Sequence, residues 1–146
     1  MRAWISAMAL ALAVAHSGAT ARSAYAATKP DEKTYAERLG ALINQYRNER
    51  AARPLTVDAA LTALAREHSV AMAKAGRLNH DEFPSRVRRS GSEMCVENVG
   101  WNYRTADAQL NAWRQSPGHD HNLLYSRVSR MGIGVASDYV TFIACE

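Results

Sequence analysis

Hydrophobic residues recur with a helical period in the first half of the chain. Leu39, Leu42, Ile43 and Tyr46 follow an i, i+3, i+4, i+7 pattern, which predicts an amphipathic helix. This helix begins in residues 28–32, where proline and two acidic residues suit a helix start, and it runs to about residue 50.

A second apolar stripe predicts a second helix that begins near Val57 and Asp58 and ends at a Gly76 cap. Arg77 to Ser92 is expected to be turn and loop, because Pro84, Ser, Gly and charged residues follow one another there. The residues predicted to share the buried face of the second helix are Leu61, Leu64, Ala65, His68 and Met72.

The second half of the chain has segments whose residue content favours strands. "VENVGWNY" after Cys95 predicts a strand, and residues 131–146 predict two strands around a Ser137-Asp138 turn. Between them we expect a third helix, capped by Thr105 or Asp107, with a short helical turn in "HDHNLLYS". Ser116-Pro117-Gly118 is predicted to end this third helix, whose expected buried residues are Ala106, Leu110 and Trp113. Helices followed by a late run of strands predict an α+β fold with an antiparallel sheet.

Residues 1–26 are expected to be a signal peptide rather than part of the fold. The apolar run from Ala3 to Ala15 is too short to span a bilayer, and Ala24-Tyr25-Ala26 has the small-x-small pattern of a cleavage site. Residues 27–146 then form a single domain that is secreted or periplasmic. Removing Arg2 and Arg22 lowers the basic residues from 18 to 16 against 14 acidic ones, so the net charge falls from +4 to +2.

The two cysteines, Cys95 and Cys145, are expected to form a disulfide in an exported protein. A catalytic cysteine is the alternative, and it is disfavoured because that compartment oxidises thiols. The arginine cluster Arg86, Arg88 and Arg89 is expected to lie in a solvated loop, with contact to an anionic surface as the alternative.

The candidate chemical groups are four histidines and one glutamate. His68 is expected to be a hydrogen-bonded core histidine, since it lies on an apolar helix face. His80, Glu97 and His119 lie at element ends, and if they converge they could hold Zn²⁺ or place a base beside a polarising group. The sequence has no H-E-x-x-H, no G-x-S-x-G, no phosphate-binding glycine loop and no basic, aromatic-interleaved stripe for nucleic acid.

Four segments in order then resemble the CAP superfamily, named for cysteine-rich secretory proteins, antigen 5 and pathogenesis-related proteins, in its short bacterial exported type. The segments are "LINQYRNERAARPLTVDAALTALAREHSVAMAKAGRLNHD", "VENVG", "AWRQSPGHDHNLL" and "RMGIGVA". The resemblance implies an α-β-α sandwich with a central antiparallel sheet. It also implies a cavity in which His80, Glu97 and His119 match the family's histidines and glutamate. In some relatives the two histidines bind Zn²⁺ or another divalent ion, so His80 and His119 are the expected metal ligands.

Two departures from the family pattern bear on this cavity. Val96 stands where the family's G-E-N motif has glycine, and valine does not suit a positive φ. Ser116 stands where larger members carry a second glutamate, which reduces the charge available to balance a divalent ion. Asn98 and Ser116 are expected to support the cavity or to be purely structural. His121 is expected to face solvent, because residues i and i+2 of a helix face apart.

The resemblance implies a binding module for a small apolar or amphipathic ligand, or for a component of the cell envelope. The alternative is a metal-assisted hydrolase that uses His80, Glu97 and His119 as its catalytic groups. A third hypothesis is an envelope interaction protein in which the histidines no longer act. Binding is favoured, because no side-chain nucleophile is evident and only two nitrogen ligands are available.

Overall fold

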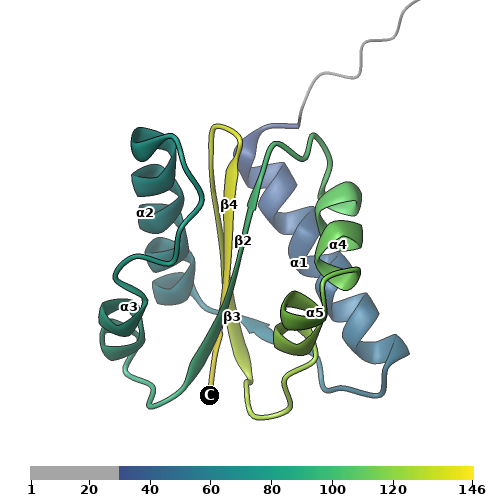
Figure 1. Ribbon diagram of the computed structural model, residues 1–146. Coiled ribbons are helices and arrows are strands. Elements are labelled where there is room, and N and C mark those ends of the chain that lie inside the picture. Colours follow the sequence, from purple (N-terminus) through teal and green to yellow (C-terminus); the bar gives the residue numbers. More distant parts are fainter. Residues whose placement is uncertain (1–29) are drawn as a thin grey trace, which may run out of the picture.

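The computed structural model describes residues 30–146, so the predicted signal peptide lies outside the described residues. A four-stranded sheet is covered by α1, α4 and α5 on one face and by α2 and α3 on the other (Figure 1). The elements are α1 (Glu32–Glu49), β1 (Thr56–Val57), α2 (Ala59–Ala75), α3 (Phe83–Ser90), β2 (Cys95–Trp101), α4 (Ala106–Arg114), α5 (Pro117–Leu123), β3 (Arg130–Ala136) and β4 (Tyr139–Cys145). The predicted α+β sandwich is confirmed.

The three longest predicted helices form with the expected caps and buried faces. The side chains of Asp31, Asp58 and Thr105 accept backbone N–H bonds at the starts of α1, α2 and α4. Gly76 ends α2 in the left-handed region, where glycine has no Cβ penalty. The positions predicted to face the core in α1, α2 and α4 are buried.

The sheet has the strand order β1-β3-β4-β2. Strands β3, β4 and β2 are antiparallel, as predicted, and the turn at Ser137 joins β3 to β4. The sequence did not predict β1, whose two residues pair in parallel with Arg130 and Met131. Strand β2 therefore forms one edge of the sheet, and β3, with β1 covering only its start, forms the other.

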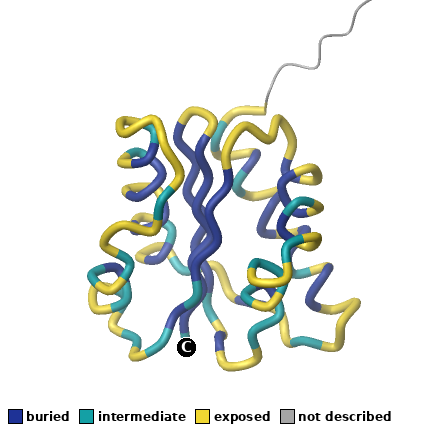
Figure 2. Tube along the Cα trace, in the orientation of Figure 1, coloured by how far each residue is buried: buried dark blue, intermediate teal, exposed yellow. Residues whose placement is uncertain are grey.

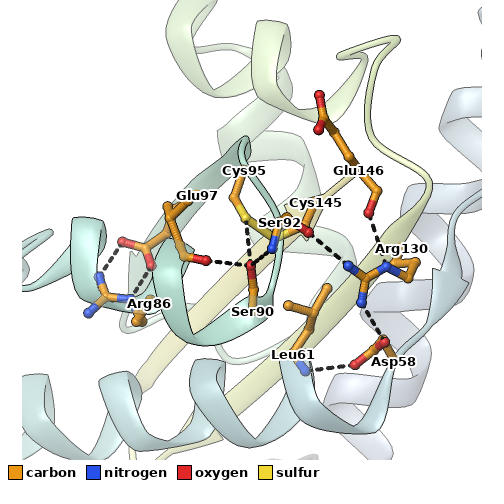
Figure 3. Close-up of a disulfide and its surroundings, with 11 residues drawn as sticks. Asp58, Leu61, Arg86, Ser90, Ser92, Cys95, Glu97, Arg130, Cys145 and Glu146 are labelled. Carbon is orange, nitrogen blue, oxygen red and sulfur yellow. Dashed lines mark hydrogen bonds and ion pairs between the residues drawn. A yellow bond between two sulfur atoms is a disulfide. The ribbon is translucent and has the colours of Figure 1, made fainter.

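The core lies on both faces of this sheet, and the strands are buried along most of their length (Figure 2). The larger cluster joins α1 and α4 to the sheet, and smaller clusters lie under α2 and α3. The predicted disulfide is confirmed, because Cys95 and Cys145 are bonded and are direct register partners on β2 and β4 (Figure 3).

Two sequence predictions need correction. Residues 77–92 were expected to be loop, but Phe83–Ser90 form α3, with Pro84 in its first turn and Gly91 as a left-handed cap. The third helix does stop where Ser116-Pro117-Gly118 predicted, since α4 ends at Arg114, but the short helical turn expected from residue 119 starts earlier, with Pro117 and Gly118 in the first turn of α5. Both segments are helical because proline fits the first turn of a helix, where its missing N–H is not needed.

Within residues 30–146, no helix is both long enough and apolar enough to cross a membrane.

Candidate functional site

Glu97 is the centre of a polar cluster at the β2 edge of the sheet. Its side chain is only 1% exposed, although it lies on an edge strand. Arg86 holds the carboxylate with two parallel bonds, Nε to Oε2 at 2.7 Å and Nη2 to Oε1 at 2.7 Å (Figure 3). A bidentate guanidinium pair of this kind is among the stronger charge-assisted interactions and satisfies a buried carboxylate.

Helix α3 places Arg86 over Glu97. Phe83 and Val87 of the same helix pack against the apolar cluster under α2, which turns Arg86 inward. A third N–H of its guanidinium donates to the carbonyl oxygen of Asp81 at 2.7 Å. The expectation that Arg86 lies in a solvated loop is therefore wrong, because its charge is matched by Glu97 inside the fold.

His80 lies between this buried pair and solvent. Its Nδ1 is 2.9 Å from Oε1 of Glu97, and 51% of its side chain is exposed. The carboxylate paired with Arg86 only accepts hydrogen bonds, so Nδ1 carries the proton that is donated. The Nε2 of neutral His80 is thereby left with its lone pair, available to a ligand or a water molecule.

His68 is the core histidine that the sequence predicted. It is buried in α2, and its Nε2 donates to the carbonyl oxygen of Asn79 at 2.8 Å. Burial lowers the pKa of His68, so its ring is neutral at pH 7 and its 3.9 Å approach to Glu97 is not an ion pair. Because Asn79 directly precedes His80, this bond fixes the loop that carries His80.

His119 approaches from the other side of the β2 edge, on the short helix α5. Its carbonyl oxygen accepts a bond from Asn98 Nδ2 at 3.0 Å, and its ring is 6.5 Å from that of Trp113. Burial lowers the pKa of His119, and the charge of protonated His80 lowers it further. His80 precedes α3 and His119 lies on α5, so the two histidines come from the helical layers on opposite faces of the sheet (Figure 1).

The remaining predicted residues have structural roles or lie on the surface outside this polar cluster. Asn98 is fully buried and also accepts from Asn122 Nδ2 at 2.9 Å, so it fixes α5 to β2. Ser116 is the first cap residue of α5, and its side chain makes no capping bond. His121 is exposed, as predicted, and lies with its ring 5.4 Å from that of Tyr125. Val96 is an ordinary β2 residue paired with Ala144, so the missing glycine leaves the strand regular.

Glu97 is not available as a third ligand beside His80 and His119 for the divalent ion that the family resemblance implies, and metal binding by the two histidines stays a prediction. Both oxygens of Glu97 are already bonded to Arg86, and one also accepts from His80. Within residues 30–146, no three His, Cys, Asp or Glu side chains are grouped so that they could hold a metal. The guanidinium supplies the positive charge beside Glu97 that a metal would otherwise supply.

Arg86 is the residue that sequence reasoning missed at this site. The signal was present, because Pro84 and Gly91 are start and stop signals for a short helix. Within that helix, Phe83 and Val87 are one turn apart, and Arg86 lies beside them on the inward face.

This fold and this cluster define an α-β-α sandwich domain with two histidines flanking a buried glutamate on an edge strand. The family model described as "CAP: Cysteine-rich secretory protein family" matches residues 41–146. The chain belongs to this family.

Solved bacterial structures share the fold. An extracellular protein containing an SCP domain from Bacillus anthracis is similar with a TM-score of 0.75 and 24% identity, over 79% of this chain and 41% of that one. A cysteine-rich secretory protein from Staphylococcus aureus gives 0.73 and 20%, over 80% of this chain and 39% of that one. An outer surface protein from Borrelia burgdorferi gives 0.70 and 18%, over 75% and 90%.

The chain thus spans about two fifths of the length of the Bacillus and Staphylococcus proteins that it resembles. A search of curated proteins gave no significant match.

Proposed function

We propose that this chain is an exported binding domain that holds a small amphipathic ligand between His80 and His119 at the β2 edge. The observation that carries the proposal is the bidentate Arg86–Glu97 pair. It uses the glutamate to orient His80 and leaves Glu97 with no free oxygen for metal binding or for water activation.

Two features support ligand binding. His80 offers a half-exposed imidazole whose Nδ1 is fixed by Glu97, so its Nε2 is oriented in advance. His119 offers a second, partly exposed ring, held near the buried indole of Trp113. Orienting polar groups beside an apolar surface in advance lowers the entropy cost of binding an amphipathic molecule.

Export is supported by the predicted signal peptide and by the disulfide, which is typical of oxidising compartments. Two of the proteins with a similar fold are an extracellular protein and an outer surface protein.

Hydrolysis is the second candidate function, and one observation favours it. A carboxylate that accepts from His80 Nδ1 leaves Nε2 able to take a proton from water, as in other histidine–carboxylate pairs. In this candidate His80 is the base, Glu97 orients it and His119 lies nearby. The absence of an evident nucleophile in the sequence places hydrolysis behind binding.

The experiment is a ligand screen on the purified protein with saturation-transfer NMR, using a library of amphipathic fragments. We expect hits whose binding is lost in His80→Ala and in His119→Ala and is unchanged in His121→Ala, which removes an exposed imidazole of the same helix. Hits that are indifferent to the first two variants would refute the proposal.

Two further measurements separate binding from the alternatives. Metal content is determined on protein purified without chelator, and we expect less than one tenth of an equivalent of Zn²⁺. Hydrolysis of p-nitrophenyl esters and of a peptide library is measured in parallel. Turnover that disappears in His80→Ala would favour the hydrolase, and stoichiometric Zn²⁺ would contradict the assignment of Arg86 as the balancing charge.

A further inference from the structure

A hollow lies on the opposite edge of the sheet from His80. It is a slot of about 590 Å³ between α1 and α2, and it runs along the outer side of β3. Its α1 wall combines the small residues Ala36, Gly40 and Ala41 with longer polar side chains, and its floor is formed by Met131, Ile133 and Val135. Val57, 67% exposed, stands at its mouth.

The floor of the slot is an incompletely paired strand. Strand β1 pairs only with Arg130 and Met131, and the N–H of Asp58 donates to the Met131 carbonyl oxygen at 2.8 Å before the chain turns into α2. Within residues 30–146, Gly132 to Ala136 have a strand neighbour only on the β4 side. Backbone groups alternate along a strand, so those of Ile133 and Val135 face the slot as those of Met131 face β1.

One side chain reaches this edge from α2. Arg66 Nη1 donates to the Val135 carbonyl oxygen at 2.9 Å and to Glu32 Oε2 at 2.7 Å. This pair bridges α1 and α2 and closes one end of the slot. The backbone N–H and C=O of Ile133 and the N–H of Val135 lie between this bridge and the end of β1.

We propose that the slot takes an extended peptide segment of a partner protein, which adds to β3 as a strand continuing the line of β1. The backbone N–H and C=O of Ile133 and the N–H of Val135, which have no strand partner, decide between the possible occupants. A hydrocarbon chain would bury these polar groups without hydrogen bonds, at a cost of about 1–3 kcal/mol for each group. An added strand forms those bonds and places alternate side chains in the apolar space beside α1.

The length of the unpaired part of β3 and the walls of the slot define the length and the side chains of the peptide. Gly132 to Ala136 are five residues, which span about 16 Å in an extended strand. Ala36, Gly40 and Ala41 keep part of the α1 wall small, so the slot suits medium-sized rather than large apolar side chains at alternate peptide positions. The partner segment is therefore four or five residues long, extended, apolar at alternate positions and free of proline at its centre.

The test uses a displayed library of random octapeptides, panned on the purified protein and counter-selected on the Ala41→Phe variant. Ala41 is an exposed helix position that lines the slot, so phenylalanine narrows the slot without disturbing the core. The matched control is Ala108→Phe, an exposed alanine on α4, which does not line the slot.

The best selected peptide is then synthesised with its natural amides and with alternate amides N-methylated. We expect at least a tenfold loss of affinity in Ala41→Phe and on N-methylation of the amides that face β3. We expect no loss in Ala108→Phe, and none in His80→Ala, which separates this surface from the proposed ligand site.

Four outcomes would overturn the proposal. They are a library that yields no peptide sensitive to Ala41→Phe, affinity that is indifferent to N-methylation, oleate binding that Ala41→Phe abolishes, and self-association that Ala41→Phe abolishes. The last two would assign the slot to a hydrocarbon or to a second copy of the chain.

Discussion

The backbone groups on the two edges of the sheet, which lack a neighbouring strand, are covered in different ways. On β2, the carbonyl oxygens of Glu97 and Val99 accept bonds from Asn122 Nδ2 at 3.1 Å and Trp113 Nε1 at 3.0 Å. On β3, side-chain cover comes from Arg66, at one end of an apolar slot. Exposed strand edges invite pairing with other chains unless they are covered. The difference is the basis of the two proposals, a ligand site of side chains at the β2 edge and a strand-pairing site at the β3 edge.

The largest expected effect is at the covered edge. Arg86→Met leaves Glu97 buried without its partner, which should lower the free energy of unfolding by about 3–5 kcal/mol. Arg89→Met removes an exposed pair with Glu67 and should lower it by no more than about 1 kcal/mol. Urea denaturation of both variants measures the contrast, and equal losses would show that the buried pair does not organise the β2 edge.

The disulfide is the next largest contribution to the same edge. It joins positions 50 residues apart, so the Cys95→Ala/Cys145→Ala double variant should lose about 3–4 kcal/mol of unfolding free energy. In this variant, amide hydrogen exchange should accelerate more in β2 than in β3, because the disulfide ties β2 to β4. Uniform acceleration across the sheet would contradict a local role at the β2 edge.

At the slot edge, alanine substitutions of two glycines should change the stability by different amounts. A Cβ at Gly134 would lie 2.0 Å from the backbone nitrogen of Arg66, so Gly134→Ala must displace α2 and should cost about 1–3 kcal/mol or more. A Cβ at Gly40 would meet only side-chain ends, Met131 Cε at 3.3 Å and Ile133 Cδ1 at 3.6 Å. Gly40→Ala also gains up to about 1 kcal/mol of helix propensity, so its net change should be close to zero. Thermal unfolding of both variants tests whether only the slot side of β3 has room.

The smallest expected effect is the pH dependence of the unfolding free energy that His68 and His119 cause. Burial lowers the pKa of His68 and His119 in the folded chain. The unfolded chain therefore binds more protons once the pH falls below the ordinary histidine pKa of 6.5, and the unfolding free energy should decrease from pH 7 to pH 5. The lowered carboxyl pKa values of Asp31, Asp58 and Glu67 act below this window.

His119→Gln should reduce the slope of that pH dependence, while His121→Gln, at an exposed position, should leave it unchanged. Denaturation curves at half-unit pH steps give the slope. An identical slope in all three proteins would place the pH response elsewhere than at the β2 edge.

Much of the fold could be predicted from local pattern. The stripes of α1, α2 and α4 and the strands around Ser137 were found because their burial repeats at the period of the element. Helix α3 was missed because its arginines suggested a solvated surface, although its start and stop residues were present. Strand β1 was missed because two residues carry no periodicity, and only pairing with β3 makes them a strand.

The candidate site divides in the same way. The sequence by itself determined the candidate groups His80, Glu97 and His119, and the core position of His68, since these follow from residue type and position within an element. Only the tertiary structure decided what Glu97 does. Its charge is matched by Arg86, eleven residues away along the chain, and this match depends on α3 packing beneath α2. Burial and charge pairing are set by packing, and that packing also left the β3 edge open.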